Sequence, residues 1–148
     1  MLPYLIRLVI LAPILIQVSR SDLRSHTIPN SKCLMLFLAG IALPLLPLWN
    51  LSWREVIITS LATAIIGYLF FLFGLGAGDA KLCTAIASLV GYDILPIVIL
   101  ACIFMGMVAL GLLITKKIDR DSRLPMAPAI SAATLIYALL PFIFYMIM

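Results

Sequence analysis

The chain has 148 residues, of which 65% are hydrophobic and 11% are charged, and its formal net charge is +4. A soluble domain is about half apolar and about a quarter charged, so this composition excludes a soluble protein and indicates an integral membrane protein. The length allows several spans of about 20 residues but no second domain, so we expect one transmembrane domain over residues 1–148. The basic residues lie in short polar segments, without a basic face interleaved with exposed aromatics, which argues against nucleic-acid binding.

Six apolar segments predict an all-α, polytopic fold with about six transmembrane helices. The polar stretch from Ser19 to Lys32 is expected to be a loop, and Gly91–Asp93 a turn. Pro44 and Pro47 predict a kink in the second segment, and the fourth segment is short for a full crossing. The predicted spans cover residues 2–18, 33–48, 56–73, 80–90, 94–114 and 126–147.

The distribution of lysine and arginine predicts the orientation, because cytoplasmic loops carry an excess of positive charge. The other side of the membrane would hold only Arg7 and Arg54. We therefore expect the loops after the first, third and fifth spans to be cytoplasmic and both termini to be non-cytoplasmic. The cations of those three loops are Arg20, Arg24, Lys32, Lys81, Lys116, Lys117, Arg120 and Arg123.

Two acids stand out in this apolar chain, because ionisable groups in membrane segments are costly and mark functional sites. Asp22 follows the first span and Asp79 precedes the fourth, so the count of spans puts both at cytoplasmic helix ends, with Asp93 on the opposite side. Two carboxylates that share a site hold one proton between them. Such a pair can act as acid and base in peptide hydrolysis.

The residues around Asp79 suit such a site. Gly76 and Gly78 lack a Cβ, which lets the backbone bend, a substrate backbone approach and neighbouring helices pack closely. Lys81 is interpreted as a side chain that extends to the membrane interface. Near the first acid, Pro29 fixes the end of the polar loop, and Asn30 with Ser31 is expected to cap the second span.

Less specific interpretations compete with this one. Asp22 lies between Arg20 and Arg24, and an acid in that position commonly forms an interfacial ion pair. His26, the single histidine, is interpreted as a loop residue. The three cysteines lie in or beside apolar segments without a Cys-x-x-Cys pair, so we expect buried thiols and no metal site. These cysteines are Cys33, Cys83 and Cys102.

Two motifs carry a family resemblance. Residues 22–30 read Asp-Leu-Arg-Ser-His-Thr-Ile-Pro-Asn, which resembles the Asp-x-Arg-x-x-x-Ile-Pro-Asn signature of type IV prepilin peptidases. Residues 76–82 read Gly-Ala-Gly-Asp-Ala-Lys-Leu, which is similar to the Gly-x-Gly-Asp-x-Lys-Leu motif of that family. Residues 124–128 resemble the Pro-x-x-Pro entry to its last helix. The motifs occur in the family's order, and the resemblance covers essentially the whole chain.

The resemblance implies an aspartic endopeptidase of the inner membrane, with its site facing the cytoplasm, that cuts the basic leader from prepilins or pseudopilins. Its partners would be that leader, the apolar helix behind it and the lipid bilayer, and it implies no cofactor. Asp22 and Asp79 match the family's catalytic pair, and the matching supporting positions are Arg24, Pro29, Asn30, Gly76, Gly78 and Lys81.

One departure from the family pattern is informative. Larger members carry paired Cys-x-x-Cys motifs in a cytoplasmic insertion of the first loop and also N-methylate the product. This first loop is short and has no cysteine pair, so we predict peptidase activity only. The compact form resembles the tight-adherence, or Flp pilus, branch, although archaeal preflagellin peptidases are also small. The sequence indicates no oligomeric state.

Other classes remain open at this point. Presenilin and signal peptide peptidase share Gly-x-Gly-Asp, but their first acid lies within a transmembrane helix. Because Ser21 and Asp22 fall in an expected loop, we predict cleavage at the membrane surface. A non-enzymatic assembly factor of a pilus or secretion machine would not require both acids. A proton-coupled transporter would place acids deep within spans.

Overall fold

The computed structural model describes residues 2–46, 51–73, 76–115 and 124–147, and it describes side chains over the parts of these ranges between residues 9 and 141. The described residues are almost entirely helical and contain no strand, so the predicted all-α class is confirmed. In chain order the elements are α1 (Leu2–Ser25), α2 (Asn30–Ala42), the short 3₁₀ helix η1 (Leu43–Leu45), α3 (Trp53–Leu72), α4 (Ala77–Val90), the 3₁₀ turn η2 (Gly91–Asp93), α5 (Ile94–Ile114) and α6 (Ala127–Ile147).

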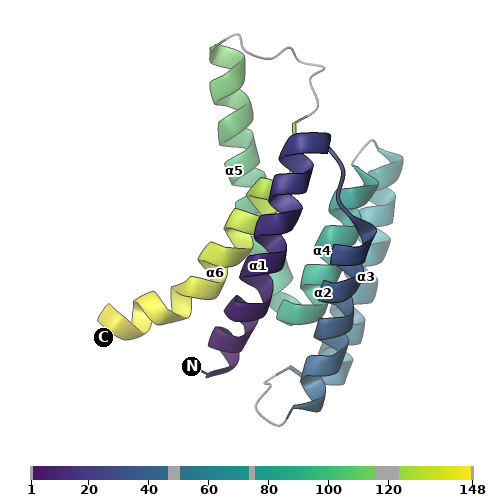
Figure 1. Ribbon diagram of the computed structural model, residues 1–148, viewed down its shortest axis with the longest axis vertical. Coiled ribbons are helices and arrows are strands. Elements are labelled where there is room, and N and C mark those ends of the chain that lie inside the picture. Colours follow the sequence, from purple (N-terminus) through teal and green to yellow (C-terminus); the bar gives the residue numbers. More distant parts are fainter. Residues whose placement is uncertain (1, 47–50, 74–75, 116–123, 148) are drawn as a thin grey trace.

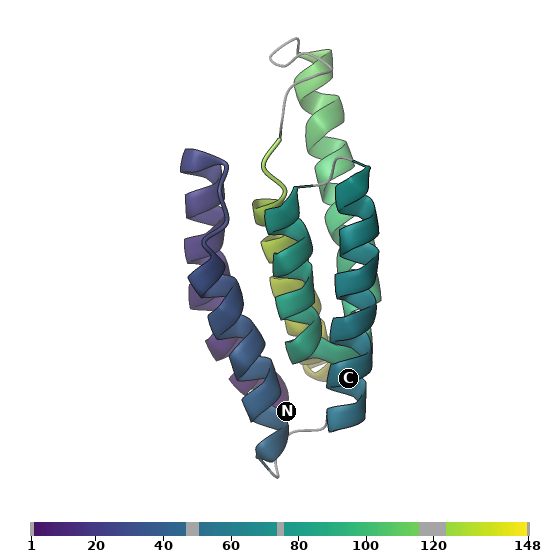
Figure 2. The same cartoon turned by 90° about the vertical axis from the view of Figure 1, so that its right-hand side faces the viewer.

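The helices form two groups that are packed more closely within themselves than against each other. In the first group, α2 and α3 both pack along α4; in the second, α1 and α5 both pack against α6 (Figures 1 and 2). Leu82, Ile86 and Leu89 project from α4 into the core and are fully buried. Fewer contacts join the groups, and these involve mainly α4 with α5 and α6 and α1 with α2.

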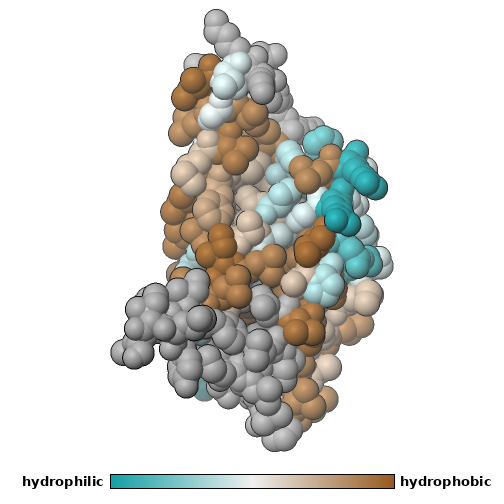
Figure 3. Space-filling model, turned by 60° about the vertical axis from the view of Figure 1, so that its left-hand side comes forward, coloured by the Kyte–Doolittle hydropathy of each residue, from teal (hydrophilic) through white to brown (hydrophobic). Residues whose placement is uncertain are grey.

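Apolar side chains cover much of the outer surface of this bundle. α3 and the stretch Ala77–Ile114 are long and apolar enough to cross a membrane. In the most apolar 18 residues of α3 only 22% are buried, and in those of Ala77–Ile114 only 11% are buried. These residues are therefore not the core of a soluble domain. Figure 3 shows the same separation on one face, where hydrophilic residues gather in one region and hydrophobic residues cover much of the described remainder. The protein is therefore membrane-embedded.

The end of α1 corrects the predicted loop over Ser19–Lys32. The helix continues through Asp22 to Ser25, since the polar residues end the apolar run without interrupting backbone hydrogen bonding. His26 has a φ of 50° and donates its N–H to the carbonyl oxygen of Asp22, at 2.9 Å, which terminates the helix. Asp22 therefore lies within a helix, and the predicted polar loop around it is wrong.

Two further boundaries differ from the prediction. α2 ends at Ala42, and Pro44 sits in the following 3₁₀ turn instead of kinking a continuous helix; Pro47 lies outside the described residues. α4 begins at Ala77, three residues before the predicted start, so Asp79 belongs to its first turn. The expected basic loop over residues 116–123 also lies outside the described residues.

Other predicted boundaries are confirmed. α5 covers Ile94–Ile114 as predicted, because its apolar run and its helix end together. α4 is short, with 14 residues, and Gly91 begins the expected turn with a φ of 64°, which favours glycine. A hydrogen bond joins this turn to α3, because the Tyr92 N–H donates to Glu55 Oε1 at 3.3 Å.

Glycine 40 allows α2 to approach α4. A Cβ built at Gly40 would overlap Ser88 Oγ and lie 2.6 Å from the Ser88 Cβ, and Ser88 is fully buried. On α5, by contrast, a Cβ at Gly106 would meet no atom within 4 Å. Alanine at Gly40 therefore changes both the packing between helices and the helix propensity, whereas alanine at Gly106 changes the helix propensity alone.

We predict that Gly40→Ala lowers the free energy of unfolding by about 1–3 kcal/mol, because overpacking pushes α2 away from α4. Gly106→Ala should leave it unchanged or raise it by up to about 1 kcal/mol through helix propensity. Thermal unfolding of both variants in the same detergent measures the difference. Equal melting temperatures would contradict this contact between α2 and α4.

Candidate acid-pair site

Both acids singled out in the sequence line one cavity of about 300 Å³, which we call the acid cavity. It opens where the end of α1, the connection to α2 and the start of α4 meet. Asp22 and Asp79 are thus brought together from helices far apart in the chain. The lining residues are Asp22, His26, Thr27, Ile28, Asn30, Gly76, Ala77, Gly78, Asp79 and Lys81.

Asp22 is held by the start of the last helix. Its side chain is 6% exposed, and its Oδ2 accepts a hydrogen bond from the Ala127 N–H at 3.0 Å. A carboxylate near a helix carboxyl end is unfavourable, because the helix dipole is negative there. Ala127 is the first residue of α6, so its free N–H and the positive end of that dipole stabilise the charge on Asp22.

The ion-pair alternative for Asp22 does not describe this structure. Arg20 and Arg24 are both exposed, and among the described residues neither forms an ion pair with the Asp22 carboxylate. The acid instead turns inward, toward the seam between α1 and α6. Arg24 does not line the acid cavity.

Asp79 occupies the first turn of α4, where the positive end of the helix dipole favours an acid. A Cβ built at Gly76, the residue before the helix, would lie 2.9 Å from Asp79 Oδ2. The missing side chain therefore leaves room for the carboxylate to fold back over the helix start.

Gly78 positions the connection between α1 and α2. A Cβ at Gly78 would lie 3.1–3.3 Å from side-chain carbons of Ile28, tighter than an ordinary packing contact. Ile28 therefore rests directly on the start of α4. Pro29 follows as the residue before α2, with a φ of −64°, so the connection enters α2 at a fixed angle. The predicted side-chain cap of α2 by Asn30 or Ser31 is wrong, because α2 has no side-chain cap hydrogen bond.

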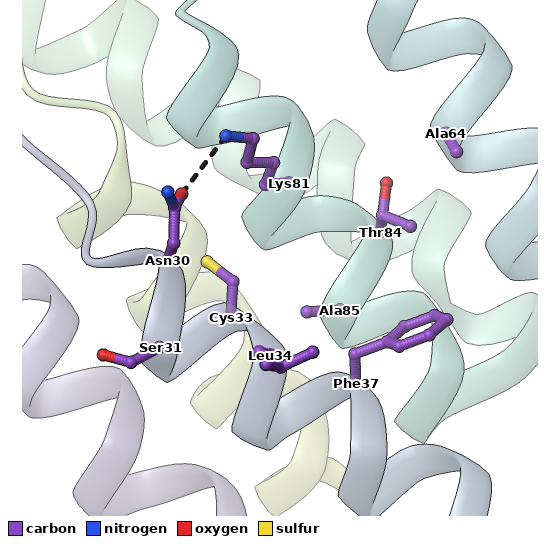
Figure 4. A pocket seen from close by; sticks show the side chains of 9 residues that line it. All are labelled: Asn30, Ser31, Cys33, Leu34, Phe37, Ala64, Lys81, Thr84 and Ala85. Carbon is purple, nitrogen blue, oxygen red and sulfur yellow. Dashed lines mark hydrogen bonds between the residues drawn. The ribbon is translucent and has the colours of Figure 1, made fainter.

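Asn30 instead binds Lys81. The lysine Nζ donates to Asn30 Oδ1 at 3.1 Å and links the start of α2 to the first turns of α4 (Figure 4). Lys81 is interpreted from the sequence as a side chain that extends to the membrane interface. In the structure it also joins α4 to α2 through this hydrogen bond. Both side chains are exposed, so they form the rim of the acid cavity.

Sequence reasoning missed two contributors to this site. His26, interpreted as a plain loop residue, lines the acid cavity. The second contributor is the Ala127 N–H, a backbone group that no particular side chain in the sequence identifies. The sequence cue to it is the pair Pro125 and Pro128, which flanks the start of α6. Among the described residues, no group of three or more His, Cys, Asp or Glu side chains is arranged to hold a metal ion.

Asp22 and Asp79 both line one cavity, and a pair of acids is the chemical equipment that an aspartic peptidase uses. Residues 9–112 match the type IV leader peptidase family, and this range includes Asp22 and Asp79. Because the match covers more than half of the chain, the protein belongs to the type IV leader peptidase family. Membership implies aspartic peptidase activity in general. No curated protein and no solved structure gives a significant match to the chain.

We predict that Asp22→Ala destabilises the fold more than Asp22→Asn. Alanine leaves the buried Ala127 N–H without its acceptor, which costs about 1–3 kcal/mol, whereas the asparagine carbonyl oxygen can still accept this bond. Thermal unfolding of the two variants in detergent measures the difference. Identical melting temperatures would show that the bond between α1 and α6 contributes little.

Proposed function

We propose that the protein is an aspartic endopeptidase that removes the basic leader from Flp-type prepilins or pseudopilins at the cytoplasmic face of the inner membrane. The observation that carries this proposal is that Asp22 and Asp79 line one cavity in a member of the type IV leader peptidase family. In this proposal the two acids share the acid and base roles, and the cavity takes the peptide segment at the cut.

We propose separate roles for the two acids, and the hydrogen bond to Asp22 supports this division. Because the Ala127 N–H stabilises negative charge on Asp22, Asp22 is the carboxylate that takes a proton from water, and Asp79 is the acid that gives its proton to the scissile carbonyl oxygen. The hydroxide adds to the carbonyl carbon and forms a tetrahedral diol. When the carbon–nitrogen bond breaks, Asp22 donates its new proton to the leaving nitrogen and Asp79 regains one from the diol. Both acids then return to their starting states.

The short first connection supports peptidase activity without methyl transfer. Only residues 26–29 separate α1 from α2, and none of them is a cysteine. The chain has no segment here that corresponds to the cysteine-paired insertion of the larger prepilin peptidases. We therefore expect the mature pilin to keep an unmethylated amino terminus.

Replacing either acid by asparagine should abolish leader removal. We expect Asp22→Asn and Asp79→Asn to lower kcat/KM by about 10²–10⁴-fold or more, since each removes one half of the acid–base pair. Glutamate at either position should cost about a hundredfold or more, because its extra methylene displaces the carboxyl group. Co-expression with a Flp-type prepilin, followed by the mass of the pilin, measures both leader loss and methylation.

Asp93→Asn is the matched control. Asp93 lies beyond the other end of α4, where its Oδ1 accepts a hydrogen bond from the Tyr137 hydroxyl at 3.1 Å, and asparagine can still accept it. This variant should cleave the prepilin as the wild type does. Continued leader removal in the Asp22→Asn and Asp79→Asn variants would overturn the proposed function. Normal pilus assembly with both acids replaced would favour the non-enzymatic assembly factor.

The proposed orientation rests on the charges near the acid cavity. Arg20 and Arg24 are exposed at the end of α1, and Lys81 is exposed at the cavity rim, whereas Asp93 lies at the far end of α4. Since positive charge accumulates on the cytoplasmic side, we propose that the acid cavity faces the cytoplasm. Six crossings with both termini outside are part of the same proposal.

Thiol labelling in intact cells tests this orientation. In a variant without the native cysteines, Arg24→Cys should react with a membrane-impermeant maleimide only after the inner membrane is opened. Tyr92→Cys, an exposed position at the opposite end of α4, should react without that treatment. The reverse pattern of labelling would place the acid cavity outside the cytoplasm.

A further inference from the structure

A groove runs from the acid cavity into the bundle. α2 and α3 each pack along α4 but hardly touch each other, which leaves a space between them with α4 as its floor. This space is a cavity of about 560 Å³, and its walls are mainly apolar (Figure 4). We call it the α2–α3 groove; its lining residues are Asn30, Ser31, Cys33, Leu34, Phe37, Ala64, Lys81, Thr84 and Ala85.

The groove is continuous with the acid cavity at one end. Asn30 and Lys81, which are joined by a hydrogen bond, line both spaces. At its other end the groove shares Phe37, Ala64 and Thr84 with a second hollow of about 270 Å³. The linked spaces therefore form one track that leads from the acids along α2.

The length of this track suits a transmembrane segment. It follows α2 from Asn30 to Ile41, which at 1.5 Å per helical residue is about 16 Å. That distance is about half of a hydrocarbon core of about 30 Å. A segment lying in the track would run from the level of the acids toward the middle of the membrane.

The side chains of the groove suit a helix as its occupant. Thr84 and Ala85 form the floor and Ala64 one wall, and small residues allow two helix backbones to approach closely. Phe37 lies on the opposite wall (Figure 4). The Thr84 hydroxyl already donates to the Ala80 carbonyl at 2.9 Å, so the floor itself presents few free polar groups.

One buried hydroxyl in the deeper hollow lacks a partner. Ser60 is 8% exposed and lines this hollow, and among the described residues its Oγ is the one buried side-chain oxygen or nitrogen without a hydrogen bond. Buried polar groups in proteins are nearly always satisfied. A backbone carbonyl of a helix in the track has a second lone pair that can accept a hydrogen bond from the Ser60 hydroxyl, whereas a lipid acyl chain has no acceptor.

We propose that the α2–α3 groove binds the apolar helix that follows the cleavage site of the substrate. This inference rests on the proposed function. With the helix in the track, the peptide bond before it lies at the rim formed by Asn30 and Lys81, next to Asp22 and Asp79. The groove thus selects substrates whose leader is followed directly by an apolar helix, and it sets the distance from that helix to the cut.

Filling the groove tests the proposal with two substrates. One is a full-length prepilin in vesicles, and the other is a short peptide that ends just after the cut. Ala64→Phe should lower the ratio of kcat/KM for the prepilin to kcat/KM for the peptide by about tenfold or more, because it blocks only the helix site. Ala62→Phe, on the same helix but outside the groove, should leave the ratio unchanged.

The outcomes separate the two proposals. If the wild-type protein cleaves neither substrate, the proposed function fails. If it cleaves both, and Ala64→Phe leaves the ratio at the wild-type value, the groove does not hold the substrate helix and the proposal is overturned. Equal loss of both activities in Ala64→Phe would reflect damage to the fold, and a second measurement then decides.

That measurement is disulfide cross-linking in the uncleaved complex. The protein carries Asp79→Asn and no native cysteine, and the prepilin carries single cysteines along its apolar helix. Thr84→Cys should cross-link to positions spaced three or four residues apart, as one face of a helix would. Ala62→Cys, the control, should not. Cross-links from Ala62→Cys but none from Thr84→Cys would overturn the proposal.

Discussion

The bond from the Ala127 N–H to Asp22 is the contact on which the site depends. It joins the last turn of the first helix to the first residue of the last helix, at 3.0 Å. Without it a buried acid would lie at the unfavourable end of a helix dipole. With it, the start of α6 supplies both a donor and a favourable dipole. The position of the acid is therefore fixed by a helix 105 residues further along the chain.

Packing along the same seam supports this bond. Leu11, Leu15 and Val18 are fully buried on the face of α1 that continues to Asp22, so the acid occupies a core position of the helix. The Ser19 hydroxyl donates to Ser131 Oγ at 2.8 Å, which fixes the register between α1 and α6 one turn away. The second acid, Asp79, is placed differently, because two glycines leave space around it. Gly76 leaves room for the Asp79 carboxylate, and Gly78 leaves room for Ile28 in the connection between α1 and α2.

The sequence predicts the class of fold and the meeting of the acids better than it predicts the local structure around them. α5 was predictable because its apolar run and its helix coincide. α1 was not, because the polar residues after Val18 end the apolar run while the helix continues to Ser25. Counting the predicted spans brought Asp22 and Asp79 to corresponding helix ends, and in the structure both line one cavity. The Ala127 N–H was not predictable, since it depends on where the last helix starts and not on a side chain.

The division of the bundle into two groups has a consequence for the acids themselves. Asp22 belongs to the group of α1, α5 and α6, whereas Asp79 belongs to the group of α2, α3 and α4. Neither group alone contains a pair. Within the described residues the chain passes from one group to the other twice, through residues 26–29 and through the η2 turn. The relative position of the two carboxylates therefore depends on how the two groups of helices pack against each other.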